Sequence, residues 1–144
     1  MEKIVKKKVG FTCGVFDLFH VGHLNILKCA KRECEHLIVG VTTDERAEKR
    51  KGRRPVIPFV ERLELIESIK YVDTAVALDT GKHEMWQRLK FDIIFVGDDW
   101  KGSAEWNDLE RKFSAAGVIV RYLPYTKNTS STLVRNIIEQ RVIN

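Results

Sequence analysis

Long apolar runs, paired cysteines and internal repeats are all missing from this sequence. No stretch approaches the ~20 consecutive apolar residues that a membrane-spanning helix needs, so we expect no membrane association. The basic stretch at the N-terminus lacks the apolar core of a signal peptide behind it, which favours a cytosolic (cytoplasmic) protein. Cys13, Cys29 and Cys34 are odd in number and lack C-x-x-C spacing, so the sequence suggests neither a disulfide framework nor a zinc site.

The composition that is present belongs to an ordinary folded protein. The 144 residues suffice to bury one sizeable core, and 44% are hydrophobic and 31% charged, a balance unlike that of disordered chains. The net charge of +5 suits an anionic small molecule as well as a nucleic acid and does not choose between them. In the absence of a low-complexity tract or a long linker, we expect one domain over residues 1–144.

Short, β-rich apolar runs alternate with segments of helical spacing. Strands are predicted at Val9–Cys13, Leu37–Thr42, Thr74–Leu78, Ile93–Val96 and Val118–Leu123. Helices are predicted at about His23–Cys34, Val60–Ile69, Met85–Lys90, Ala104–Ala116 and Thr132–Gln140. The alternation predicts an α/β fold, a Rossmann-like open parallel sheet of about five strands with helices on both faces. Ligands of such sheets bind beyond the carboxyl ends of the strands, so the residues that follow each strand are the candidates for a site.

Two histidines stand where the first predicted strand gives way to a helix. The segment reads Gly14-Val15-Phe16-Asp17-Leu18-Phe19-His20-Val21-Gly22-His23. Gly22 allows a ligand to approach the backbone closely, and a helix N-terminus presents unpaired N–H groups to an anion. The imidazole N–H groups of His20 and His23 can reach phosphate oxygens there. A lone histidine would indicate a packed or surface residue, whereas this pair predicts a phosphate site.

This segment resembles the H-x-G-H signature of the cytidylyltransferase-like nucleotidyltransferases, and it is most similar to the bacterial glycerol-3-phosphate cytidylyltransferase group. The resemblance runs from about Val9 to Ile138, nearly the whole chain. It includes, in order, Thr43-Asp44-Glu45, Glu61-Arg62, Tyr71-Val72-Asp73, Gly97-Asp98-Asp99-Trp100 and Tyr122-Leu123-Pro124. H-x-G-H alone is moderately specific, but the ordered set is strongly so.

The resemblance implies an enzyme that condenses an NTP, with CTP favoured, and a small phosphorylated metabolite such as glycerol-3-phosphate or a similar polyol phosphate. A phosphate oxygen of the acceptor attacks the α-phosphorus in line, and pyrophosphate leaves. Mg²⁺ is expected to arrive on the triphosphate rather than on protein side chains. A homodimer is also expected from the resemblance. The implied catalytic residues are His20, His23, Lys51 and Arg62, and the implied nucleotide-binding residues are Gly14, Val15, Phe16, Asp17, Gly22, Gly97, Asp98, Asp99, Thr126, Ser130, Ser131 and Thr132.

The basic run Lys49-Arg50-Lys51-Gly52-Arg53-Arg54 follows the second predicted strand. Read alone, it is a solvated loop or a nucleic-acid patch, but no aromatic stacking residues or recognisable RNA-binding module accompany it. Beside a nucleotide site, a mobile lysine loop can close over the triphosphate; by the resemblance Lys51 makes this contact, with Lys49 second. Arg62 has no acid at the spacing of a helical ion pair, which favours the role near the substrate phosphate that the resemblance implies.

Two further segments follow later strands. Gly97-Asp98-Asp99 comes after a very apolar strand and suits either a turn or contacts to a base or ribose. Thr126 to Thr132 carries five hydroxyls, more than one helix cap requires, and hydroxyls with backbone N–H groups at a helix start can bind phosphate. In the related cytidylyltransferases an arginine stands where this chain has Tyr125.

Two alternatives stay open. An adenylyltransferase of the same superfamily, using ATP, is favoured by Ser130-Ser131-Thr132 and by Tyr125 in place of the arginine of the CTP-specific pattern. A non-catalytic nucleotide-binding or RNA-binding module on the same fold belongs to a different class, because a fold does not fix a function. The four candidate catalytic residues together argue against a pure binder.

Overall fold

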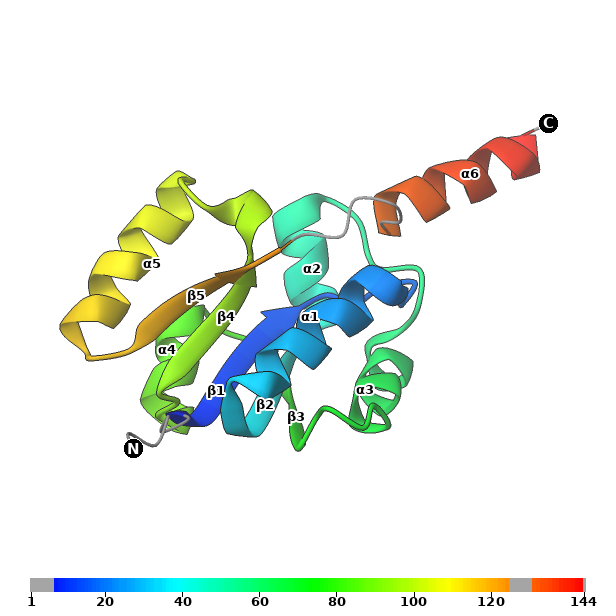
Figure 1. Cartoon of the computed structure of the whole chain (residues 1–144). Coiled ribbons are helices and arrows are strands. Elements are labelled where there is room, and N and C mark those ends of the chain that lie inside the picture. Colours follow the sequence, from blue (N-terminus) through cyan, green and yellow to red (C-terminus); the bar gives the residue numbers. More distant parts are fainter. Residues whose placement is uncertain (1–6, 125–130, 144) are drawn as a thin grey trace.

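The computed structural model describes residues 7–124 and 131–143 as an open, all-parallel β-sheet covered by helices (Figure 1). Its elements, in chain order, are β1 (Lys7–Gly14), α1 (Val21–Arg32), β2 (Cys34–Thr42), α2 (Asp44–Lys51), α3 (Phe59–Glu67), β3 (Thr74–Leu78), α4 (Lys82–Leu89), β4 (Ile93–Gly97), the 3₁₀ turn η1 (Asp98–Trp100), α5 (Ala104–Ala115), β5 (Ile119–Leu123) and α6 (Ser131–Ile143). The strand order is β3-β2-β1-β4-β5, so β1 is central. The predicted α/β class, the five parallel strands and the helices on both faces are confirmed.

The sheet divides the core into two apolar layers. Because successive side chains of a strand point to opposite faces, Ile38 of β2 and Ile94 of β4 join one layer, while Val39 and Phe95 join the other. Residues of α4 and α5 cover the first layer, and residues of α1 and α3 cover the second. Both faces are buried, which explains why the central strands read as continuous apolar runs.

One helix was not expected from the sequence. The run predicted as a mobile basic loop begins inside α2, whose N-cap Thr43 accepts a hydrogen bond from Arg46 N, and Lys49 and Lys51 lie in its last turn. Gly52 then ends the helix in the left-handed conformation, with φ of 80°. Only Ala47 of this helix is buried, so its sequence carries almost no apolar periodicity.

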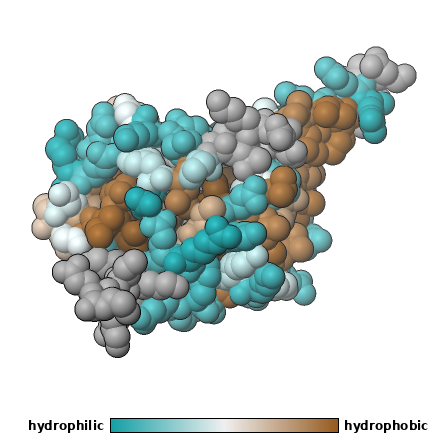
Figure 2. Space-filling view, viewed as in Figure 1, coloured by the Kyte–Doolittle hydropathy of each residue, from teal (hydrophilic) through white to brown (hydrophobic). Residues whose placement is uncertain are grey.

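Helix α6 extends away from the sheet (Figure 1). Apolar surface gathers over it in the space-filling view (Figure 2), where Leu133, Ile137 and Ile138 are 41–48% exposed. Among the described residues, no helix has both the length and the apolar character needed to cross a lipid bilayer.

Candidate active site

His20 and His23 hold one another in place at the start of α1. His20 is the N-cap residue: its Nδ1 accepts a hydrogen bond from Gly22 N at 3.0 Å. In return, the backbone N–H of His20 donates to Nδ1 of His23 at 3.3 Å. This reciprocal arrangement is a capping box built from two imidazoles instead of a hydroxyl and a carboxylate. The two rings stack with their centroids 4.0 Å apart.

The hydrogen bonds fix the tautomer of both neutral rings. Each Nδ1 accepts a backbone N–H, so in each ring the single proton must lie on Nε2. Burial lowers the pKa of His20, and burial together with the charge of His20 lowers the pKa of His23 to about 4. At neutral pH the pair therefore offers two uncharged Nε2–H donors.

The loop before the histidines is strained. Phe16 and Leu18 both adopt left-handed backbone, with φ of 54° and 50°. For residues that carry a Cβ this costs about 1–2 kcal/mol each. Strain of this kind collects where a loop is held in one shape for a ligand, and here the ring of Phe16 packs edge-on against His23.

A basic cavity of about 150 Å³ opens beside His23. Its lining residues are Val15, Phe16, Asp17, His23, Ala47, Lys51, Arg53, Arg54, Pro55, Thr132 and Arg135. Four of these are cationic and one is anionic, so the cavity is electrostatically suited to a polyanion. Burial and the nearby guanidinium of Arg135 lower the pKa of Lys51, which shows how closely the cations crowd.

Asp17 is the single acid that lines the basic cavity, and it is 3% exposed. Its hydrogen bonds join segments on different sides of the cavity. Its carboxylate accepts hydrogen bonds from the backbone N–H groups of Val56 and Ile57 at 2.8 and 2.9 Å, and from Nη2 of Arg135 at 2.7 Å. Burial opposes the ionisation of Asp17, but these donors outweigh it and lower the pKa of the carboxyl group. Asp17 is thus ionised and joins the loop before α3 to helix α6.

A second, apolar cavity of about 350 Å³ adjoins the first. Its lining residues are Cys13, Gly14, Val15, Thr42, Ala47, Arg50, Lys51, Leu78, Lys82, Phe95, Val96, Trp100, Glu105 and Trp106. Val15, Ala47 and Lys51 line both cavities, so Lys51 stands at their junction. Lys49 lines neither, which favours Lys51 over Lys49 as the predicted phosphate contact.

Residues 11–137 match the model of the family described as cytidylyltransferase-like. The chain belongs to this family. Two curated relatives, the FAD synthases of Pyrococcus horikoshii and Pyrococcus abyssi, are 40% and 37% identical to it over 131 residues, which are 88% of this chain and 87% of each relative. The protein is therefore a nucleotidyltransferase, as the sequence predicted.

Solved structures agree with this membership. A lipopolysaccharide core biosynthesis protein from Thermoplasma volcanium superposes with a TM-score of 0.70 and 28% identity, over 85% of this chain and 99% of that one. A pantoate–beta-alanine ligase from Francisella tularensis superposes with a TM-score of 0.64 over 90% of this chain and 65% of that one. At 14% identity the second likeness shows the fold alone.

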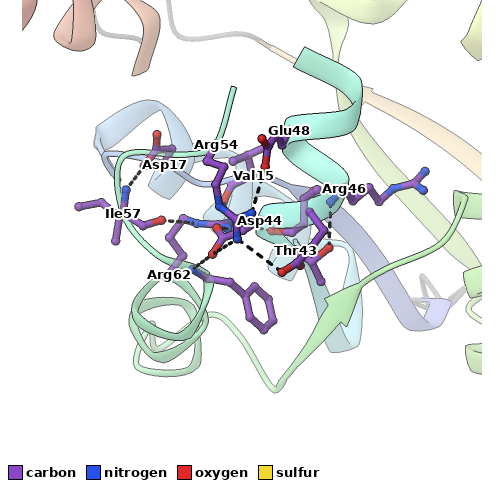
Figure 3. Close-up of polar contacts among 12 residues, drawn as sticks. Val15, Asp17, Thr43, Asp44, Arg46, Glu48, Arg54, Ile57 and Arg62 are labelled. Carbon is purple, nitrogen blue, oxygen red and sulfur yellow. Dashed lines mark hydrogen bonds and ion pairs between the residues drawn. The ribbon is translucent and has the colours of Figure 1, made fainter. Parts of the chain in front are cut away.

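Arg62 does not occupy the place that its predicted role requires (Figure 3). The side chain is fully buried, and its guanidinium donates to the backbone oxygens of Ile57, Val15 and Thr42 and to Oδ1 of Asp44, at 2.7–2.8 Å. Because four protein acceptors hold it in the interior, the predicted contact with a substrate phosphate is wrong. In this nucleotidyltransferase Arg62 ties α3 to the ends of β1 and β2.

The predicted base-binding segment lies at the edge of the apolar cavity rather than in it. Gly97 ends β4 and is buried, while Asp98 and Asp99 are exposed in η1. Trp100, two residues further, does line the apolar cavity. The contact of Asp98 and Asp99 with a base or ribose stays a prediction.

The hydroxyl-rich segment is described only in part. Thr126 and Ser130, with Tyr125, lie outside the described residues. Ser131 begins α6, and Thr132 lines the basic cavity as predicted from its position at a helix start. Arg135, one turn further, lines the same cavity and was missed. Its partner in the site, Asp17, lies 118 residues earlier in the chain, so no local sequence pattern pointed to it.

Proposed function

We propose that this nucleotidyltransferase transfers the adenylyl group of ATP to FMN, forming FAD and pyrophosphate. The observation that carries the proposal is the stacked pair of Nε2–H donors on His20 and His23, because His23 lines a basic cavity that adjoins an apolar, aromatic-lined one. A triphosphate matches the first cavity and a flavin the second. The relatives named FAD synthase support this acceptor.

This proposal replaces the CTP and polyol phosphate favoured by the sequence and adopts the adenylyltransferase alternative. FAD consists of FMN and AMP joined through a pyrophosphate link, so a chain that resembles FAD synthases needs ATP and a phosphorylated flavin. Tyr125, where CTP-using relatives carry an arginine, agrees with this choice. A polyol phosphate would leave the large apolar cavity unfilled.

The reaction is an in-line substitution. A phosphate oxygen of FMN forms a new bond to the α-phosphorus of ATP, and the bond from that phosphorus to the α–β bridging oxygen breaks. The electron pair leaves with pyrophosphate. The protein has no covalent role in this scheme; it positions the two phosphates and stabilises the charge that moves onto the bridging oxygen.

His20 and residues that line the basic cavity divide this work. The two Nε2–H groups donate to the α- and β-phosphates without carrying a charge of their own. Lys51, at the junction of the cavities, neutralises the phosphates of both substrates, and Thr132 and Arg135 steady the triphosphate from α6. Arg62 acts through its contacts, as a positioning residue for the loop that follows β1.

The described residues offer no set of three histidine, cysteine or acidic side chains that could hold a metal ion. The basic cavity is cationic, which does not fit a metal held by protein ligands. In the proposed reaction Mg²⁺ would enter on the triphosphate, and no step above is assigned to it.

The test is a substrate screen with two variants. Wild-type protein is incubated with each of CTP and ATP against FMN and glycerol-3-phosphate, and pyrophosphate release and FAD are measured. We expect ATP with FMN to give both products, and His20→Ala or His23→Ala to lower kcat by ~10²–10³-fold, or roughly 3–4 kcal/mol, as the loss of an oxyanion donor does.

His36 supplies the control, because it lies on β2 and lines neither cavity. His36→Ala should leave kcat within twofold of wild type. Turnover that favours CTP with glycerol-3-phosphate would overturn the substrate assignment. Salt-sensitive RNA binding with no pyrophosphate release from any pair would overturn the enzymatic proposal itself.

A further inference from the structure

The apolar cavity has a lining suited to a planar aromatic ligand. Trp100 and Trp106 contribute indole rings to its wall, with Leu78, Phe95 and Val96 from the ends of β3 and β4. Aromatic and aliphatic walls of this kind bind a flat ring system by stacking and by burial of its faces. A small polar acceptor would gain nothing from them.

One polar cluster interrupts this lining. The carboxylate of Glu105 lies between two cations: Nζ of Lys82 is 3.2 Å from its Oε1, and Nη2 of Arg50 is 3.3 Å from its Oε2. The Lys82 side chain is only 11% exposed and its ammonium lies 5.5 Å from the centroid of the Trp106 ring. Burial opposes the ionisation of Glu105, but the charge of Lys82 and its hydrogen bond outweigh this and lower the pKa of Glu105.

All three side chains line the cavity, and the order of the ion-paired groups is donor, acceptor, donor. The pyrimidine edge of a flavin presents the complementary order, because C2=O accepts, N3–H donates and C4=O accepts. Cytosine offers acceptor, acceptor, donor and does not match. A flavin also has the three fused rings that would fill the space between this edge and the indoles.

We infer that the apolar cavity binds the isoalloxazine ring of the acceptor and that Lys82, Glu105 and Arg50 recognise its pyrimidine edge. The inference rests on the proposed function, which supplies the flavin. The apolar cavity meets the basic cavity at Val15, Ala47 and Lys51, so the phosphate of a flavin bound in the first can reach the second. The ring would then lie in one cavity while its phosphate reaches the other.

The experiment is a fluorescence titration with FMN and with N3-methyl-FMN, in which the central donor is blocked. Quenching of flavin emission reports binding without turnover. Glu105→Leu should weaken FMN binding by about 10–100-fold, the range for loss of a hydrogen bond to a charged group. Wild-type protein should bind N3-methyl-FMN more weakly than FMN, to a similar extent. The Glu105→Leu variant should bind the two flavins with equal affinity. Glu105→Gln, which keeps an acceptor oxygen, should recover most of the affinity.

Matched controls lie on the same elements or carry the same ring. Asp108→Leu removes an acid from α5 that does not line the cavity, and should leave FMN binding unchanged. Trp106→Phe should reduce flavin quenching, whereas Trp86→Phe should not, because Trp86 lines neither cavity.

The outcomes separate the inference from the function on which it rests. FAD synthesis with N3-methyl-FMN bound as tightly as FMN would overturn the edge recognition and leave the function standing. FMN binding with the expected pattern but no FAD from any nucleotide would support the cavity assignment and overturn the function. Absence of both FMN binding and FAD synthesis would overturn both.

Discussion

At the scale of single residues, His20 and His23 are built to work uncharged. Their Nδ1 atoms are occupied by backbone N–H groups, and burial disfavours the protonated rings. In the proposed reaction these neutral N–H donors would accelerate the step to the extent that their hydrogen bonds strengthen as charge moves onto the bridging oxygen. In the proposed scheme the positive charge comes from Lys51 and Arg135, which line the basic cavity.

Buried neutral His23 makes stability depend on pH. Its pKa is about 4 in the folded protein against an ordinary value of 6.5 for a solvated histidine, so between these values the unfolded chain binds more protons. The unfolding free energy contributed by this ring is therefore complete above about pH 6.5 and is lost as pH falls towards 4, by at most about 1.4 kcal/mol per pH unit.

Urea denaturation at intervals from pH 4.5 to 7.5 measures this dependence. The pKa values of Asp17 and Asp44 are also lowered, so these carboxyl groups add their own pH dependence at the acid end of the range. Comparing wild type with His23→Asn isolates the contribution of His23. The variant should show a shallower slope. Parallel slopes for the two proteins would contradict the neutral, buried state of His23.

At the scale of secondary structure elements, the junction between β2, α2 and α3 depends on one buried guanidinium. Arg62 bonds to Thr42 at the end of β2, to Asp44 at the start of α2 and to Val15 after β1 (Figure 3). Removing a buried charge partner costs more than the pair itself contributes, because the remaining polar groups stay buried without donors.

Arg62→Ala should therefore lower the unfolding free energy by about 3–5 kcal/mol, measured by urea denaturation. Asp44→Asn, which keeps most of the cluster, should cost less and provides a folded variant if the first does not fold. Arg88→Ala, which breaks an exposed pair with Asp79, should cost under about 1 kcal/mol. Equal losses for Arg62→Ala and Arg88→Ala would show that the cluster is not structural.

The elements predicted from the sequence bury an apolar face, and the one that was not predicted, α2, does not. The buried strands and the amphipathic helices follow from apolar periodicity, and the position of the site follows from the strand ends. Helix α2 has a single buried residue, Ala47, so periodicity could not reveal it. The partner of Arg62 was sought one helical turn away, whereas Asp44 lies 18 residues earlier in the chain. Contacts of that range come from the tertiary fold.

At the scale of the whole molecule, the sheet order brings two binding cavities to one edge. β1 lies between β2 and β4, so the loops after these three strands converge. Lys51 is the charged residue common to both cavities, while Arg135 lines the basic cavity and Glu105 the apolar one. The two substrates should therefore depend on separate residues except at this lysine.

Bisubstrate kinetics test this arrangement. Arg135→Ala should raise KM for ATP by about 10-fold and leave KM for FMN within twofold, consistent with the loss of one charged hydrogen-bond donor. Lys51→Met should raise both KM values. An effect of Lys51→Met on one substrate alone would place that lysine in a single cavity and contradict its junction position.

The site as a whole was accessible to sequence reasoning only where its residues follow strands. Of the residues predicted in this way or from the start of the last helix, His23 and Thr132 line the basic cavity, and their contact with a nucleotide stays a prediction. Arg135 lies 118 residues from its partner Asp17, and a separation of that length leaves no local pattern. The apolar cavity likewise gathers residues from four strands and three helices, which only the folded chain brings together.

The bonds of Asp17 have a consequence for how the protein can fail. The carboxylate of Asp17 binds the backbone N–H groups of Val56 and Ile57, which precede α3, and the guanidinium of Arg135 in α6. Asp17 itself lies outside the strands of the sheet. Loss of this carboxylate would take an acceptor away from the N–H groups of Val56 and Ile57 and from Arg135, so it should lower the stability of the protein and loosen the walls of the basic cavity.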